Sequence, residues 1–348
     1  MRRAVAAAAV VIPLSLTMAS PAGACGGLIG ENGTIELVRT TTLAAYSNGV
    51  ERYVTGFEFT GEGQEVGSII PLPDVPTEVI RGGDWTLQRL AQEVAPPAPA
   101  ADARRESADA ASAGPEIILE TEIDALDITV LKGGGDEVGE WATENGFLLT
   151  PDAPEMLDFY AQRSPVFMAA RFDADRAAEL GQGAGDSTPI MATIPTDDPW
   201  VPLRILGLGL EPDQVVEADV FMLTDEEPDL LAGGPGVDVL RSEAASDLLL
   251  DDLRSDVGME WVPESMWLSY LQVNTPAGDL DFDLAASTDP NTPPSLVDTG
   301  VDAPHALSLQ LDAPGRALWP VVLGAGAGLA VLVLGTRRSR LATRQVPI

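Results

Sequence analysis

The stretch Tyr46 to Phe59, YSNGVERYVTGFEF, is the strongest local indication of the fold in this sequence. Two extended runs, 34–46 and 50–59, meet at Ser47-Asn48-Gly49. Asn-Gly is a strong hairpin signal, because both residues tolerate positive φ. In the second run, Tyr53, Thr55, Phe57 and Phe59 alternate onto one face. The pattern therefore predicts an antiparallel hairpin whose aromatic row enters a core.

The rest of the chain predicts further strands mixed with short helices. Extended apolar runs predict strands over 66–70, 116–131, 166–172, 190–194, 203–210, 215–223 and 266–273. Asp84 is expected to cap a helix that continues to Val94, and Ser242 to cap the clearest one, Glu243 to Val257. The fold class predicted is α+β: a mainly antiparallel sheet with several short amphipathic helices, plus one C-terminal transmembrane helix.

The N-terminus has the parts of a secretory signal peptide. Residues 1–24 combine the basic Arg2 and Arg3, an apolar run, and Ala22-Gly23-Ala24 as an A-x-A cleavage site. Cleavage there would leave Cys25 as the first mature residue. Lipidation of Cys25 is a further reading of the same residues.

The C-terminus predicts a membrane anchor. Residues 317–336 are 20 residues without a charge, and the tail 337–348 after them carries four arginines. The positive-inside rule places this basic tail in the cytoplasm and the N-terminus outside. The expected location is therefore the cell membrane, with a single pass.

Between the two ends we expect one extracellular α+β domain on a stalk. Residues 25–273 form the predicted domain, and residues 95–115, rich in Pro, Ala, Asp and Ser, are predicted to be a flexible insertion. Residues 274–316 are rich in Pro, Asp, Ser and Thr, which predicts an acidic stalk between the domain and the membrane.

The charge of the chain limits its partners. The chain has 54 acidic and 20 basic residues, for a formal net charge of −34, and every acid lies between Cys25 and Arg316. Nucleic acid is excluded, because phosphate binding requires a basic face. Such an excess of acid favours solubility, and it is expected to bind divalent cations only diffusely or to meet a basic partner.

No catalytic, cofactor-binding or metal-ligating residue is predicted, and no cofactor. The single histidine, His305, and the single cysteine, Cys25, exclude most schemes with a histidine base, a histidine-bearing zinc site and an intramolecular disulfide. Carboxylate chemistry stays open, although nothing marks Glu51, Glu58, Asp84 or Glu93 as a matched acid and base.

Two further features have simple structural readings. The acids of 279–283 have calcium-loop spacing, but Leu284 and Pro290 stand where an EF-hand needs Gly and Glu, so a solvated strand edge is expected. Five tryptophans could stack on sugars, but core or half-buried positions are favoured for them: Trp85, Trp141, Trp200, Trp261 and Trp267.

Several blocks resemble a bacterial family catalogued as domain of unknown function 2330. The blocks are Cys25-Gly26-Gly27, YSNGVERYVTGFEF at 46–59, IPLP at 70–73, GDWTLQRL at 83–90, and the segments 141–149 and 160–172. The resemblance implies an exported envelope protein and no known activity. Many members begin with C-G-G-x-x-C, whereas Gly30 stands at the second cysteine here, which removes a disulfide or metal role for that pair.

These observations predict a non-enzymatic surface module that binds an envelope protein or polymer. The alternative is a carboxylate-dependent hydrolase acting on cell-wall or extracellular polymer. Two carboxylates in a tryptophan-lined cleft would favour the hydrolase, and a flat apolar patch would favour the binding module.

Overall fold

The computed structural model of this chain describes residues 27–30, 40–57, 65–95, 116–147, 149–182, 188–232, 235–289 and 291–301. The predicted signal peptide, nearly all of the insertion, the membrane segment 317–336 and the basic tail lie outside the described residues. Among the described helices, none has the length and apolar character needed to cross a membrane.

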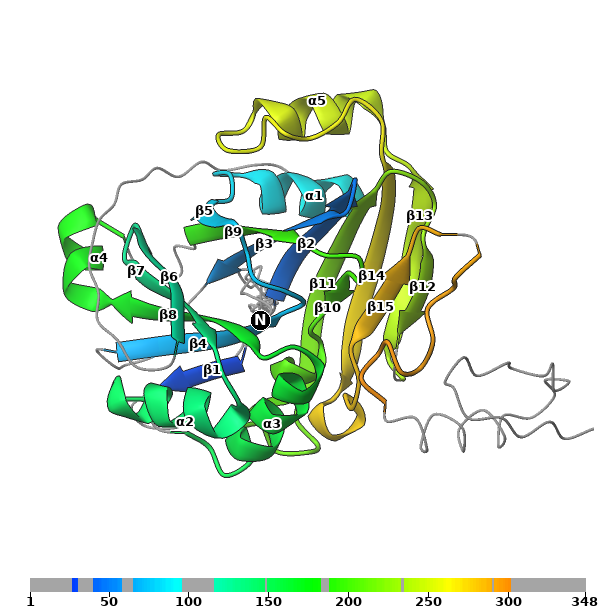
Figure 1. Cartoon of the computed structure of the whole chain (residues 1–348). Coiled ribbons are helices and arrows are strands. Elements are labelled where there is room, and N and C mark those ends of the chain that lie inside the picture. The colour runs from blue at the N-terminus through cyan, green and yellow to red at the C-terminus, as the bar shows by residue number, and fades with distance from the viewer. Residues whose placement is uncertain are drawn as a thin grey trace, which may run out of the picture. The chain divides into compact units, whose positions relative to one another are not determined.

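The largest of three sheets has seven strands (Figure 1). They are β2 (Thr40–Ser47), β3 (Val50–Phe57), β5 (Glu78–Arg81), β9 (Thr188–Pro195), β11 (Val215–Thr224), β13 (Val237–Ala244) and β14 (Trp267–Pro276). Their spatial order is β13-β14-β11-β2-β3-β9-β5. Only β2 and β11 pair in parallel among the described strands, so the mostly antiparallel α+β class is confirmed.

A five-stranded sheet and a three-stranded sheet accompany the first. The five strands are β1 (Gly27–Gly30), β4 (Glu65–Leu72), β6 (Glu116–Ile123), β7 (Leu126–Lys132) and β8 (Val166–Asp173), ordered β1-β4-β8-β7-β6. The three are β10 (Trp200–Val201), β12 (Asp229–Ala232) and β15 (Leu284–Ser287), ordered β10-β15-β12.

The described helices are short. They are α1 (Thr86–Val94), α2 (Gly135–Glu144), α3 (Ala153–Arg163), α4 (Ala174–Leu180) and α5 (Asp247–Ser255), with two 3-10 turns, η1 (Arg204–Gly207) and η2 (Ala277–Asp279). Figure 1 shows α1 and α5 together on one side of the molecule, and α2 and α3 together on the opposite side.

The core consists of three apolar clusters that separate four layers. The central cluster lies where the three sheets face one another, and includes Tyr53 and Met168. A second packs α1 and α5 on the outer face of the seven-stranded sheet, and a third packs α2 and α3 on the outer face of the five-stranded sheet. Both large sheets are thus covered on both faces, which explains their nearly continuous apolar strands.

The hairpin predicted from 46–59 is confirmed. Strands β2 and β3 pair antiparallel, and Asn48 and Gly49 at the turn have φ values of 53° and 75°. Tyr53 is buried in the central cluster as expected, and Val54 is buried on the opposite face, under α1 and α5. Phe59 lies outside the described residues.

Residues 116–131, predicted as one strand, form the hairpin of β6 and β7. The chain reverses at Asp124 and Ala125, where Asp124 has a φ of 54°. The sequence offers no Asn-Gly signal there, and the turn depends on the tolerance of aspartate for the left-handed region.

Residues 203–210, predicted as a strand, contain the 3-10 turn η1 instead. The backbone N–H groups of Leu203 and Arg204 donate to the Asp283 carboxylate at 2.8 and 3.1 Å. A side chain distant in sequence thus satisfies donors that a strand would give to its neighbour.

The helix predicted at 243–257 begins at Asp247, and Ser246 rather than Ser242 caps it. The Ser246 hydroxyl accepts from the Leu249 N–H at 3.2 Å. Glu243 and Ala244 belong to β13 and pair with β14. Sheet pairing therefore outweighs the local helix propensity of these residues.

The folded domain continues past residue 273, where the sequence prediction ended it. Part of the predicted stalk forms β15, which pairs with β10 and β12. Asp283, Thr299 and Val301 are buried. Residues 302–316 lie outside the described part of the chain.

Candidate functional site

A groove of about 860 Å³ opens beside α3. Helix α3 supplies one wall, η1 supplies Arg204, and the chain on either side of β15 supplies the rest. The lining residues are Glu155, Asp158, Phe159, Gln162, Arg163, Arg204, Asp281, Phe282, Val297, Gly300 and Val301. The groove thus combines apolar side chains with both signs of charge, as ligand sites do.

Asp283 is buried beneath the groove and contacts residues of the elements that form its walls. Its carboxylate is fully buried, and one oxygen accepts from the Tyr160 hydroxyl at 2.7 Å and from the Leu203 and Arg204 N–H groups. The other oxygen pairs with Nη1 of Arg163 at 2.6 Å. One side chain therefore connects α3, η1 and β15.

Arg163 is held on every side. Its second nitrogen, Nη2, donates to the Asp298 carbonyl oxygen, and its guanidinium lies 4.0 Å from the ring centroid of Trp200. The Trp200 ring in turn stacks on Tyr160, with 5.9 Å between centroids. The planar guanidinium suits this combination of ion pair and stacking.

Arg204 is engaged in a similar way at the mouth of the groove. Its guanidinium lies 4.2 Å from the centroid of Phe159, and Nη2 pairs with Glu155 at 2.9 Å. Phe159 packs edge-on against Tyr160, with 4.9 Å between centroids.

Burial dominates the electrostatics behind the groove. It raises the pKa of Asp283, against the lowering effects of Arg163, Tyr160 and the Leu203 and Arg204 N–H groups. Burial and the adjacent Asp283 also raise the pKa of Tyr160 well above its usual value. Tyr160 therefore stays a hydrogen-bond donor at any physiological pH.

Glu51 is a second buried carboxyl in this region. It is fully buried and forms no ion pair among the described residues, and the Trp200 backbone approaches its carboxyl without the geometry of a normal hydrogen bond. Burial raises its pKa to about 8; the Trp200 backbone and the charge of Arg163 lower it, and Asp198 raises it further. Glu51 is thus mostly a neutral acid at pH 7.

The alternation of β3 is a sequence signal for the burial of Glu51. Along β3, Glu51 alternates with the buried Tyr53 and Thr55, so all three face the same side. A glutamate on the same face of a strand as core residues is predicted to be buried. No comparable signal exists for Asp283, which lies in a segment predicted to be solvated.

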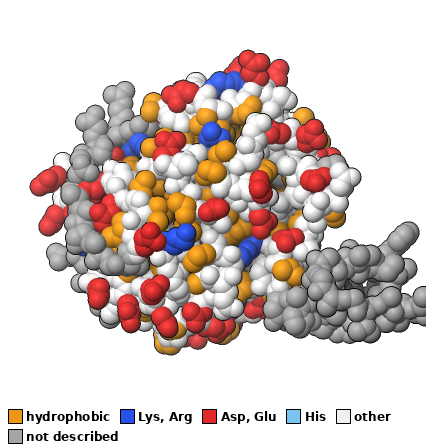
Figure 2. Space-filling view, viewed as in Figure 1, with side chains coloured by type: hydrophobic (Ala, Val, Ile, Leu, Met, Phe, Trp, Pro, Cys, Tyr) orange, Lys and Arg blue, Asp and Glu red, His pale blue; other side chains and the backbone are white. Residues whose placement is uncertain are grey.

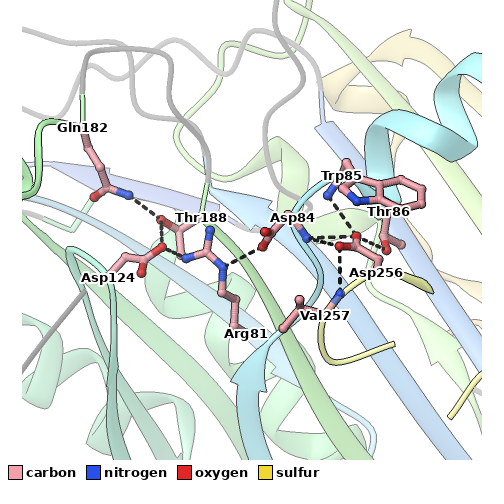
Figure 3. Close-up of polar contacts among 9 residues, drawn as sticks. All are labelled: Arg81, Asp84, Trp85, Thr86, Asp124, Gln182, Thr188, Asp256 and Val257. Carbon is pink, nitrogen blue, oxygen red and sulfur yellow. Dashed lines mark hydrogen bonds and ion pairs between the residues drawn. The ribbon is translucent and has the colours of Figure 1, made fainter. Parts of the chain in front are cut away.

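A different polar cluster ties α1 to α5 (Figure 3). The buried Asp256 carboxylate accepts from the N–H groups of Asp84 and Trp85, and from the Thr86 hydroxyl at 2.8 Å. The N-cap of α1 is Trp85, not Asp84 as predicted. A carboxylate distant in sequence therefore provides the cap.

The same cluster reaches the β6–β7 turn through Arg81. Its guanidinium bridges Asp84, at 3.2 Å, and the buried Asp124. Thr188 also donates to Asp124, at 3.3 Å (Figure 3). Because protein donors engage both buried carboxylates, Asp256 and Asp124, we interpret this cluster as structural.

Replacing Asp256 by alanine is expected to lower the free energy of unfolding by about 2–3 kcal/mol, because several donors lose their shared acceptor. Urea unfolding of the full-length protein, followed by tryptophan fluorescence, measures this. Asp251→Asn, on the exposed side of α5, is the control and should change it by less than about 0.5 kcal/mol. Equal effects of the two changes would contradict the capping role.

A smaller hollow of about 360 Å³ lies on the other side of α3, against α2. Leu149, Pro154 and Leu157 give it an apolar lining. Three acids of α2 stand one helical turn apart along it: Asp136, Glu140 and Glu144.

The structure does not bring the residues singled out in the sequence together at the groove. Trp141 and Trp200 are buried, and Trp85, Trp261 and Trp267 are half-buried; none lines the groove, whose rings are phenylalanines. Asp283 is buried, so the strand-edge interpretation of 279–283 was wrong for this residue. Among the described residues, no group of three or more His, Cys, Asp or Glu side chains could hold a metal ion.

Comparisons with known proteins show what this chain is similar to. No curated protein matches it. Two solved structures of baculovirus P35, one of them a mutant after caspase cleavage, match at 9% identity with TM-scores of 0.38 and 0.37. Each match covers 72% of this chain, and 94% and 99% of the respective P35 chains. P35 in complex with caspase-8 matches at 8% identity, with a TM-score of 0.33.

The family comparison is more informative than these distant structures. The model described as "Uncharacterized protein conserved in bacteria (DUF2330)" matches residues 19–226, which is more than half of the chain. It covers β2 and β3, the helices α1 to α4, and Arg163 and Arg204 of the groove. The chain therefore belongs to the DUF2330 family of bacterial proteins, as the blocks in its sequence predicted.

Proposed function

We propose that this protein is a membrane-anchored extracellular binding module, and that the groove beside α3 is its ligand site. The observation that carries the proposal is the Asp283 centre behind the groove, which holds α3, η1 and β15 in one arrangement. A site whose walls are already ordered loses less entropy on binding. The ligand proposed is an envelope protein or polymer.

The membrane location rests on the two ends of the chain. The signal-peptide pattern of 1–24 and the uncharged segment 317–336 with its basic tail support export and a single pass. The domain would then face outward, with the tail in the cytoplasm.

The hydrolase remains the second candidate because carboxylates line the groove: Glu155, Asp158 and Asp281. Its test is the release of soluble fragments from envelope polymer. If the native protein releases fragments and an Asp158→Asn/Asp281→Asn variant does not, the result would support hydrolysis as the function in place of binding.

Photo-crosslinking in intact cells tests the binding function. A photoreactive benzoylphenylalanine replaces Gln162, an exposed residue that lines the groove, or Asp238, an exposed residue on β13, in the full-length protein. One adduct that forms from position 162 and not from 238 is expected. Equal adducts from both positions, or none from 162, would contradict the proposal.

Gly300→Ala is expected to deform the groove. Gly300 has a φ of 91°, and an added Cβ would lie 2.5 Å from Cζ of Phe159. Steric overlap with the ring, added to the backbone strain, is expected to cost about 2–3 kcal/mol of stability and to abolish the adduct from position 162.

Gly181→Ala is the matched control for this change. Gly181 also has a positive φ, 73°, but its added Cβ would meet nothing within 4 Å. Only the backbone strain, about 1 kcal/mol, should appear there, with crosslinking unchanged. Chemical unfolding measures both stabilities. Equal losses would show that the Phe159 ring moves aside without lowering the free energy of unfolding.

A further inference from the structure

We infer that the ligand of the groove is a basic peptide segment, in which lysine or arginine side chains meet the carboxylates and rings of the groove. This inference rests on the proposed function and names the chemistry of its ligand. The arginines of the groove already have partners in the protein, whereas two of its acids form no ion pair among the described residues.

The two cations of the groove are already engaged by groups of the protein itself. Arg163 pairs with Asp283, donates to the Asp298 carbonyl and stacks on Trp200. Arg204 pairs with Glu155 and stacks on Phe159. An incoming carboxylate or phosphate would compete with these contacts, and breaking the Arg163 pair would leave Asp283 buried without its partner.

The acids of the groove are in the opposite situation. Asp158 and Asp281 are exposed, and within the described part of the chain neither forms an ion pair. They come from different elements of the groove lining, because Asp158 belongs to α3 and Asp281 precedes β15. The charge left for a ligand to neutralise is therefore negative.

The aromatic residues favour the same class of ligand. Phe159 and Phe282 are half-buried and line the groove. The stacking of Arg204 on Phe159 at 4.2 Å shows that a ring at this position accepts a guanidinium, with Arg204 itself using one face of that ring. A ring beside a carboxylate is the arrangement that binds alkylammonium and guanidinium groups.

The extent of the acidic surface points to a segment rather than a single small cation. Helix α3 lines both the groove and the apolar hollow, and the lining of the hollow includes Asp136, Glu140 and Glu144. Figure 2 shows acidic side chains gathered along the edge of the molecule where α2 and α3 lie in Figure 1. A basic peptide that also carries an apolar side chain would match both hollows.

Fluorescence anisotropy with defined peptides tests the inference on the full-length protein at 150 mM salt. The probes are two labelled nonapeptides of alternating alanine with arginine or with glutamate. We expect the arginine peptide to bind, the glutamate peptide not to bind, and Asp158→Asn/Asp281→Asn to weaken binding about tenfold.

The control separates the groove from the general negative charge of the protein. Asp238→Asn/Asp251→Asn removes the same charge from exposed positions on β13 and α5, and should change the affinity less than about twofold. Phe159→Leu should weaken the arginine peptide about threefold by removing the ring, with thermal unfolding as the check that this variant folds.

Two outcomes would overturn the inference, and they are distinguishable. Equal weakening by both double variants, or binding of the glutamate peptide, would refute a cationic ligand while a specific adduct from position 162 still supported the groove as a binding site. Failure of both peptides together with no adduct from 162 would remove the proposed function as well.

Discussion

Asp283→Ala is expected to lower the free energy of unfolding by about 3–5 kcal/mol. The change removes the acceptor of the Tyr160 hydroxyl and of the Leu203 and Arg204 N–H groups. It also leaves the half-buried Arg163 guanidinium without its carboxylate. Breaking a buried pair costs more than the pair contributes, because a buried charge is left uncompensated. Urea unfolding of the full-length protein measures the loss.

Two companion variants make this result specific. Asp281→Ala, two residues away on the exposed surface, should change stability by less than about 0.5 kcal/mol. Asp283→Asn keeps an acceptor for Tyr160 but turns a neutral amide toward Arg163, so an intermediate loss is expected. If Asp283→Ala were no more harmful than Asp281→Ala, Asp283 would not be the centre that holds the groove.

Glu51→Gln is expected to stabilise the protein at neutral and alkaline pH. The pKa of Glu51 is raised from 4.5 to about 8 by burial. Below pH 4.5 both the folded and the unfolded states hold the proton, and no penalty exists. Between pH 4.5 and 8 the unfolded state ionises while the folded state keeps its proton, so stability falls by about 1.4 kcal/mol per pH unit. Above pH 8 the loss is complete.

The difference in stability between Glu51→Gln and the native protein isolates this one group. Glutamine is neutral and nearly isosteric with protonated glutamate, so the difference should be near zero at pH 4. It should grow to about 4–5 kcal/mol in favour of the variant by pH 8. Urea unfolding at five or six pH values measures it, and a difference independent of pH would contradict the burial of an unpaired carboxyl.

A matched control uses the same substitution on the surface. Glu144→Gln lies at an exposed position near the end of α2. Its difference from the native protein should stay within about 0.5 kcal/mol across the same pH range, because an exposed carboxyl has nearly the same environment in both states.

Local signals in the sequence predicted several elements correctly. The Asn48-Gly49 turn, the apolar period of α1 at Leu87 and Leu90, and the alternation of β3 are each visible within a dozen residues. Such signals act through φ preference and side-chain periodicity, which need no knowledge of distant residues. The α+β class follows from them.

The errors occurred where a distant partner decided the local structure. Glu243 and Ala244 have good helix propensity, but β14 recruits them into a sheet. Residues 203–210 have a pattern typical of a strand, but the N–H groups of Leu203 and Arg204 donate to the Asp283 carboxylate instead of to a neighbouring strand. Asp84 looks like a cap, but Asp256 satisfies the first turn of α1. Each case pairs residues about 25 to 170 positions apart, which no local pattern reports.

Composition and local patterns were enough to show the single histidine, the single cysteine and the excess of acid. They were also enough to predict the hairpin at 46–59 and the family resemblance. Which of the 54 acids matter follows from the folded structure, which buries Asp283 beside Arg163 and buries Glu51 without an ion pair. The physical reason is that ionisation and pairing depend on desolvation and on the nearest charges, which folding brings together from separate parts of the chain.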